Sequence, residues 1–239
     1  MRLDGESILK HFSLNGRSTP TTVTLLLLCT LHFLIASPTT KSMAAAPTYP
    51  PLIKVAALCG SLRKASYNRG LLNAAIDISK TFKGLEVEYV DISGLPFLNT
   101  DLEVNGTYPP AVEAFREKIA AADSVLFASP EYNYSVTGPL KNAIDWASRP
   151  PNVWADKTAA IVSAGGGFGG GRSQYHLRQI GVYIDLHFIN KPEFFLNVFQ
   201  SPSKFDSDGN LHDDLTKEKL KALLLSLHGF TLRLQGKSA

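Results

Sequence analysis

The stretch Ile53–Cys59 (IKVAALC) and the loop that follows it, Gly60–Asn68 (GSLRKASYN), carry the strongest structural signal in this 239-residue sequence. The continuous apolar run is bounded by proline and glycine, a pattern typical of a strand that is buried on both faces of a parallel sheet. The apolar side chains of residues 68–82 then fall on one helical stripe, and the asparagine at its start is a residue type that caps helices well. A buried strand, a polar loop and a helix in succession predict the first unit of an α/β sheet.

Strand-like and helical patterns alternate along the rest of the chain. Further strands are predicted at residues 86–92, 124–129, 158–164 and 183–189, with a shorter strand-like piece at 194–198. Helices are predicted at residues 109–122, 138–147, 172–182 and 215–234. This alternation predicts an α/β fold with a doubly wound, five-stranded parallel sheet.

The composition favours one well-packed domain without a nucleic-acid surface. Apolar residues make up 44% of the chain and charged residues 19%, which is enough apolar material for a sizeable core. From Met43 onward the chain has 20 basic and 19 acidic residues, so it lacks the excess of positive charge that binds nucleic acid. Cys29 lies in an N-terminal apolar run and Cys59 ends the first strand. One cysteine in each region excludes a disulfide framework and indicates a reducing compartment for the body of the chain.

Residues 1–42 are predicted to be an N-terminal extension, and residues 43–239 the functional domain. The extension contains an apolar run of 14 residues, Val23–Ala36, which is short for a membrane span of roughly 20 residues. Three interpretations remain open: a signal peptide, a plastid or mitochondrial transit peptide, and a translation start at Met43. A sequon argues against secretion, because a glycan at Asn133 would obstruct a loop that we assign to a ligand below. We expect a cytoplasmic protein if translation starts at Met43, and otherwise a plastid protein or one associated with a membrane through its extension.

Three polar or glycine-rich loops follow predicted strands. They are Gly60–Asn68, Pro130–Gly138 (PEYNYSVTG) and Gly165–Arg172 (GGGFGGGR). Because ligands of doubly wound sheets bind beyond the carboxyl ends of the strands, we expect these loops to meet at one edge.

The first loop has the donors that hold a phosphate monoester. Ser61, Arg63, Ser66 and Asn68 supply hydroxyl, guanidinium and amide groups, and the start of the following helix supplies free backbone N–H groups. The loop matches neither the Walker pattern nor G-x-G-x-x-G, which disfavours nucleoside triphosphates and a Rossmann dinucleotide site. On this loop alone, an ordinary polar connection between strand and helix is an equal alternative.

Two motifs together point to a family. G-S-L-R-x-x-S-x-N at residues 60–68, followed by P-E-Y-N-x-S-x-x-G-x-L-K-N-A-I-D-W at residues 130–146, resembles the NADPH-dependent FMN reductase family. Within it, the pair is similar to the NAD(P)H:quinone oxidoreductases of plants and to bacterial quinone/chromate reductases. The resemblance extends over about residues 54–234. It implies a flavodoxin-like fold, FMN as cofactor, NADPH or else NADH as reductant, and the two-electron reduction of quinones to hydroquinones by ping-pong hydride transfer through FMN.

The resemblance also implies which residues bind the cofactor. The first loop would bind the FMN phosphate, the second would border the isoalloxazine, and the third would bring backbone donors to its N1/C2 carbonyl edge. The implied residues are Ser61, Leu62, Arg63, Ser66, Asn68, Pro130, Glu131, Tyr132, Asn133, Ser163, Gly165 and Gly166. An extended backbone at residues 130–133 would offer N–H and C=O groups to the flavin, and Tyr132 would either cover part of a ring face or simply pack. Neither a catalytic side chain nor a metal ligand is expected, because the flavin carries the covalent chemistry.

In relatives of this kind, the arginine, tyrosine and glutamate that match Arg172, Tyr175 and Glu193 meet at subunit contacts near the flavins. The resemblance therefore implies a homodimer or homotetramer with these three residues near the interface. Salt bridges on the surface without a function are the alternative.

Three rival functions stay open at this point. A flavodoxin-type electron carrier would bind FMN without accepting hydride, although flavodoxins are usually strongly acidic and this domain is nearly neutral. A reductase of azo dyes, chromate or free flavin would share the site but use another acceptor, and a non-catalytic flavin-binding protein is the third rival. Elsewhere, Asp206–Asn210 (DSDGN) has a faint likeness to a calcium loop, but its Asp-Gly pair favours a simple turn.

Overall fold

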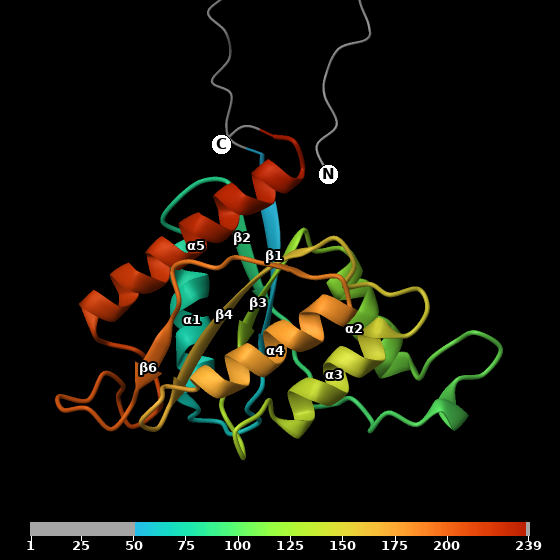
Figure 1. The fold of residues 1–239 in the computed structure, drawn as a ribbon, viewed down its shortest axis with the longest axis horizontal. Helices are drawn as coiled ribbons and strands as arrows, with labels where there is room; N and C mark the ends of the chain where they lie inside the picture. The colour runs from blue at the N-terminus through green and yellow to red at the C-terminus, as the bar shows by residue number, and fades with distance from the viewer. Residues whose placement is uncertain (1–50, 238–239) are drawn as a thin grey trace, which may run out of the picture. The chain divides into compact units, whose positions relative to one another are not determined.

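A parallel sheet forms the centre of residues 51–237, the part of the chain that this computed structural model describes (Figure 1). Its strands lie in the order β2-β1-β3-β4-β5, and β6 pairs with the far end of β4. The strands are β1 Ile53–Cys59, β2 Leu85–Tyr89, β3 Ser124–Ala128, β4 Thr158–Gly165, β5 His187–Phe188 and β6 Phe195–Asn197. Every ladder between them is parallel. This order is that of a flavodoxin-like doubly wound sheet, which confirms the predicted fold class.

Helices cover both faces of the sheet. They are α1 Tyr67–Ser79, α2 Pro110–Ala120, α3 Gly138–Ser148, α4 Gly171–Tyr183 and α5 Asp214–Leu234, with a short 3₁₀ helix, η1, at Thr100–Leu102. The helices α1 and α5 bury their apolar stripes on one face, and α2, α3 and α4 bury theirs on the other (Figure 1). Each face therefore has its own apolar layer, as the continuous apolar strands predict.

Strand β1 shows why the first apolar run was informative. Val55, Ala57 and Cys59 pack in the layer beneath α1 and α5, while Ala56 and Leu58 pack in the opposite layer. Successive side chains of a strand point to opposite faces, so a strand covered by helices on both sides needs apolar residues at every position. Only Lys54 in this strand is exposed.

The prediction of a strand at residues 183–189 is largely wrong. Helix α4 continues to Tyr183, and the backbone N–H of Ile184 still donates to the Ile180 carbonyl at 3.2 Å. The chain then turns at Asp185, whose φ is 62°, and leaves only His187–Phe188 as a strand. Val182 and Tyr183 favour a strand by residue type, but they are 84% and 90% exposed at the helix end. Local propensity was overridden by the helical hydrogen bonds.

The predicted cap of the first helix is also wrong. Helix α1 begins at Tyr67, and its N-cap residue is Ser66. The side chain of Asn68 is buried and bonds elsewhere, as described below. The interpretation of residues 1–42 lies outside the described residues. Within residues 51–237, the helices fall short of the length and apolar character that crossing a membrane requires.

Candidate functional site

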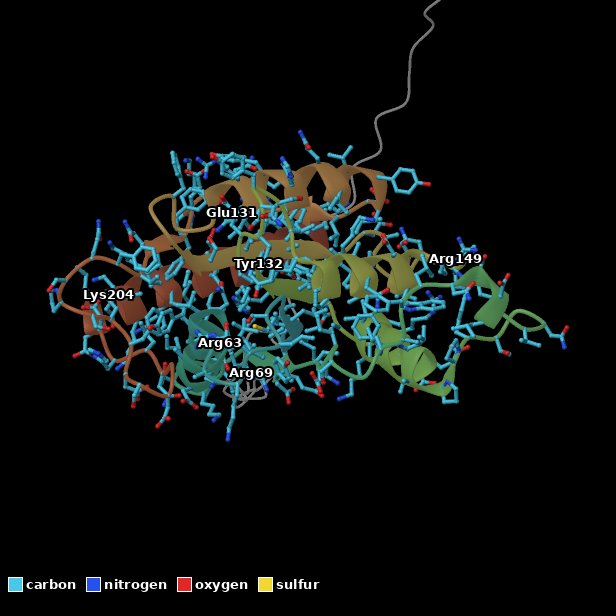
Figure 2. All side chains as sticks on the ribbon, turned by 90° about the horizontal axis from the view of Figure 1, so that it is seen from below. Arg63, Arg69, Glu131, Tyr132, Arg149 and Lys204 are labelled. Atoms are coloured by element: carbon cyan, nitrogen blue, oxygen red, sulfur yellow. The ribbon has the colours of Figure 1, made fainter. Side chains whose placement is uncertain are left out.

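The three loops meet at the carboxyl edge of the sheet, as expected. Figure 2 looks onto this edge and shows Arg63, Tyr132 and Glu131 gathered at its centre, with Arg149 and Lys204 on opposite sides. The first two loops are joined where the Thr137 hydroxyl donates to the Gly60 carbonyl at 2.6 Å. The topology thus brings together segments that lie more than 70 residues apart in sequence.

The predicted cofactor-binding residues differ in their solvent exposure at this edge. Leu62, Arg63, Tyr132 and Asn133 are exposed, Glu131, Gly165 and Gly166 are partly buried, and Ser61, Ser66, Asn68, Pro130 and Ser163 are buried. Leu62, Arg63, Glu131, Tyr132 and Asn133 can contact a ligand through their side chains, whereas the two glycines and the buried residues would reach it mainly through the backbone.

The first loop places positive potential at the start of α1. This helix has no side-chain cap and no acidic residue in its first turn, so its first N–H groups are directed outward as a partial positive charge. The Arg63 guanidinium lies 5.5 Å from the ring centroid of Tyr67, the first helical residue. A cation beside a helix N-terminus is unfavourable unless an anion lies between them, so this arrangement is suited to a phosphate.

The Cys59 thiol is buried directly before this loop and is expected to be unreactive. Burial raises the pKa of Cys59 above its ordinary value of 9.0, although hydrogen bonds from Ser61 and Ser66 and the charge of Arg69 oppose the shift. A neutral, buried thiol is a poor nucleophile. The Ser66 hydroxyl is directed toward this sulfur rather than capping the helix.

Asn68 links the first loop to the end of β4, directly before the third loop. Its Nδ2 donates to the Ala164 carbonyl at 2.8 Å, and its Oδ1 accepts from the Ala164 N–H at 3.0 Å. Both residues are almost completely buried. The amide that the sequence offered as a phosphate donor is therefore used to tie α1 to the end of β4.

The second loop does not stay extended. Tyr132 and Ser135 exchange backbone hydrogen bonds of 3.1 and 3.0 Å, and between them Asn133 and Tyr134 have φ values of 50° and 67°. Two successive residues with positive φ reverse the chain in a tight turn. The prediction of an extended backbone as far as Asn133 is wrong, and the turn leaves the Tyr132 ring 51% exposed above the edge.

Buried hydrogen bonds of Ser163 support the third loop. The Ser163 hydroxyl donates to the Gly169 carbonyl at 2.6 Å and accepts from the Gln174 amide at 2.7 Å. A Cβ on Gly170 would lie 2.7 Å from the Cβ of Ser163, and this glycine has a φ of +87°. The Ser163 side chain therefore supports the loop, in which Gly165 and Gly166 are partly buried and Gly167 and Phe168 are exposed.

Arg172 joins the second and third loops. Its guanidinium lies 3.9 Å from the ring centroids of both Tyr134 and Phe168 and pairs with Glu131 at 2.9 Å. The Glu131 carboxylate also accepts the Arg172 backbone N–H at 3.0 Å, which places a negative charge at the start of α4. The Arg172–Glu131 pair thus keeps the Tyr134 and Phe168 rings beside the carboxyl edge of the sheet.

Tyr175 and Glu193 form a separate pair. The Tyr175 hydroxyl donates to Glu193 at 3.1 Å, and Lys191 donates to the other carboxylate oxygen at 3.0 Å. The hydrogen bond from Lys191, followed by that from Tyr175, lowers the pKa of Glu193 below its ordinary value of 4.5. Within the chain, Arg172 bonds to Glu131 instead of joining this pair.

Sequence reasoning missed four residues of this edge: Thr137, Phe168, Gln174 and Arg69. The first three shape the loops as described above. The Arg69 guanidinium lies 3.3 Å from the Tyr89 ring centroid, and burial raises the pKa of that phenol to about 12. Threonine before Gly-Pro is a helix-start signal that would have identified Thr137; the other three depend on contacts distant in sequence.

The comparisons with known proteins agree with this geometry. The model of the NADPH-dependent FMN reductase family matches residues 53–201. An NAD(P)H:quinone oxidoreductase of Solanum tuberosum is 78% identical over 188 residues, which are 78% of this chain and 97% of that protein. An NADPH:quinone oxidoreductase of Arabidopsis thaliana is 73% identical over 196 residues, 82% of this chain and 100% of that protein.

A solved structure extends the likeness to three dimensions. The flavoenzyme NAD(P)H:(acceptor) oxidoreductase FerB of Paracoccus denitrificans superposes with a TM-score of 0.66 at 30% identity, covering 76% of this chain and 98% of that one. The motifs, the strand order, the three converging loops and these matches agree, and the chain belongs to the NADPH-dependent FMN reductase family.

Proposed function

We propose that this protein is an FMN-dependent NAD(P)H:quinone oxidoreductase. The observation that carries the proposal is the uncapped start of α1 beside Arg63, on the same sheet edge as the exposed Tyr132 ring and the backbone of Gly165 and Gly166. The positive potential is suited to the phosphate of FMN. The neighbouring aromatic side chain and glycine backbone are suited to its planar ring. The names of the plant relatives support quinones as the acceptor.

Different loops would bind different parts of FMN. Arg63 and the first N–H groups of α1 would hold the phosphate, with Ser61, Leu62 and Ser66 shaping the loop around it. Pro130, Glu131, Tyr132 and Asn133 would border the ring, while Gly165 and Gly166 would present backbone donors to its carbonyl edge. When bound, FMN supplies the capacity to accept hydride from NAD(P)H and to pass two electrons to a quinone.

The exposure of Tyr132 on this edge supports a ping-pong scheme. One exposed tyrosine turn borders the ring position, so the nicotinamide and the quinone would occupy the same place in alternation. We therefore expect parallel double-reciprocal lines when NADPH and a quinone are varied together.

Rapid mixing of the FMN-loaded protein with NADPH under anaerobic conditions tests the function directly. The flavin absorbance near its visible maximum should bleach without any acceptor and return when a benzoquinone is added. A flavodoxin-type electron carrier would show no bleaching by NADPH, and intersecting double-reciprocal lines would reject the shared position. Replacing the quinone with an azo dye, chromate or free flavin in the second step ranks the acceptors.

We also propose a homodimer or homotetramer with Arg172, Tyr175 and Glu193 near the interface. The Tyr175 ring is exposed on α4, and Val182 and Tyr183 extend an uncovered apolar surface along the same helix, which is the kind of surface that subunit contacts bury. Light scattering should give a mass of two or four chains, and a monomer at micromolar concentration would contradict the proposal.

Residues 43–239 are proposed to be the flavodoxin-like FMN-binding reductase domain, with residues 1–42 a separate extension. The Arabidopsis relative is matched over its whole length by 82% of this chain, which supports the division. A start at Met43 would make the enzyme cytoplasmic, and a retained extension would direct it to a plastid or a membrane. N-terminal sequencing of the native protein distinguishes these cases.

A further inference from the structure

A short hairpin after β6 contacts both the end of the proposed phosphate loop and the first turn of α1. Residues 203–212 form this hairpin, in which Phe205 and Leu211 pair across the turn. It lies beyond residue 201, where the match to the family model ends. Figure 1 shows it as the orange loop below β6. We propose that this hairpin positions the loop Gly60–Ser66 for the FMN phosphate, an inference that rests on the function proposed above.

The hairpin has a firm internal structure. The Asp206 carboxylate accepts the backbone N–H groups of Asp208 and Asn210 at 2.9 and 2.8 Å, and the Gly209 N–H donates to the Asp206 carbonyl at 3.1 Å. The hydrogen bonds from Asn210 lower the pKa of Asp206 below its ordinary value of 3.8, so the carboxylate is charged and the turn is closed at neutral pH. These bonds make DSDGN a structural turn.

The first contact joins two backbones. Gly209 is buried against Ala65, and a Cβ on Gly209 would lie 2.7 Å from the Ala65 carbonyl oxygen. On the other side, a Cβ on Gly70 would lie 1.9 Å from the Gly209 carbonyl oxygen. The tip of the hairpin is thus packed against both the end of the phosphate loop and the first turn of α1, at a distance that only glycine permits.

The second contact reaches Arg63 through aromatic rings. Phe205 stacks on Tyr67 with a centroid distance of 4.5 Å and an interplanar angle of 25°, and the Arg63 guanidinium lies 5.5 Å from the other ring of that pair, Tyr67. Lys204, which lies to one side of Arg63 in Figure 2, pairs with Asp213 at 3.4 Å. The hairpin therefore acts on the loop through packing, because its own lysine is committed to the start of α5.

The phosphate loop needs such support. Among its own bonds are those from the Ser66 N–H to the Arg63 carbonyl at 3.2 Å and from the Arg63 N–H to the Ser61 hydroxyl at 3.3 Å, and Leu62, Arg63 and Lys64 are exposed. Donors that are held in place before a ligand arrives bind it more tightly, because less conformational entropy is lost. Gly209 and Phe205 are accordingly positioning residues.

Gly209→Ala in the full chain tests the proposal, with Gly106→Ala as the matched control. Both glycines lie in hairpin turns with φ values of +84° for Gly209 and +78° for Gly106, but Gly106 is exposed and a Cβ on it meets nothing within 4 Å. The two variants share the backbone strain, and only the first displaces the phosphate loop. Affinities are measured by quenching of FMN and riboflavin fluorescence, since riboflavin lacks only the phosphate.

We expect Gly209→Ala to weaken FMN binding by about tenfold, the effect of losing roughly one charge-assisted hydrogen bond, and to change riboflavin binding by less than about twofold. Gly106→Ala should leave both affinities unchanged. Phe205→Leu removes the stacking without altering the backbone, and it should reproduce the FMN-selective loss if Gly209→Ala fails to fold in a thermal melt.

The outcomes separate this inference from the function on which it rests. Equal losses for FMN and riboflavin, or no loss for either, in both hairpin variants would overturn the positioning role while leaving the proposed function intact. A wild-type protein that binds neither flavin would overturn the proposed function and this inference with it.

Discussion

Replacing Arg63 with alanine is expected to weaken FMN binding by about 10- to 100-fold, because charge-assisted hydrogen bonds to a phosphate contribute about 1.5–3 kcal/mol. Arg63 is exposed beside the uncapped start of α1. The first turn of this helix has no acidic side chain that would neutralise the positive potential there. Riboflavin, which has no phosphate, should bind the variant nearly as well as it binds the wild type. Quenching of flavin fluorescence measures both affinities.

Two further variants sharpen the Arg63 test. Lys64→Ala removes a positive charge from the neighbouring exposed position and should change FMN affinity only slightly, because long-range charge is screened by salt. Arg63→Lys should recover part of the affinity, since lysine keeps the charge but lacks the planar fork of donors. If Arg63→Ala reduced FMN and riboflavin binding equally, the phosphate would have to be held elsewhere.

Replacing Asn68 with alanine is expected to destabilise the protein by about 2–4 kcal/mol. The substitution leaves the buried N–H and C=O of Ala164 without partners, and each orphaned buried group costs about 1–3 kcal/mol. For a domain of this size the Tm should fall by roughly 5–15 °C. Thermal unfolding followed by circular dichroism measures the change.

Asn73→Ala is the matched control for this second prediction. It is the same substitution in the same helix at an exposed position, where alanine should be neutral or slightly stabilising. Because Asn68 connects the first loop to the end of β4, directly before the third loop, its loss should also weaken FMN and riboflavin binding to a similar degree, unlike Arg63→Ala. Equal melting temperatures for the two asparagine variants would mean that the link to Ala164 contributes nothing.

The core of the fold was predictable because its signals are local. A strand buried on both faces must be apolar at every position, and β1 at Ile53–Cys59 was predicted to the residue. The paired motifs after β1 and β3 likewise predict two loops of the candidate site from residue types alone. These patterns depend only on residue type and spacing.

The errors arose where a side chain has a partner that is distant in sequence. Asn68 suggests a cap and a phosphate donor when its own helix is considered alone, yet its amide bonds to Ala164, 96 positions away. Glu131 stays a proposed flavin contact, but the partner of its carboxylate, Arg172, is likewise distant in sequence, and no local pattern identified it. In both cases a buried or partly buried polar group has to be satisfied inside the protein, and its partner is set by the packing.

The amino-acid sequence by itself determined the alternation of strands and helices, the family and the identity of the loops that converge. Apolar periodicity and short motifs encode these because each is decided within one segment. Only the tertiary structure decided which polar atoms remain available to a ligand, and it placed the hairpin at residues 203–212 against the loop that carries Arg63. Hydrogen bonds and close backbone contacts between segments depend on the packed chain as a whole, so no local pattern specifies them.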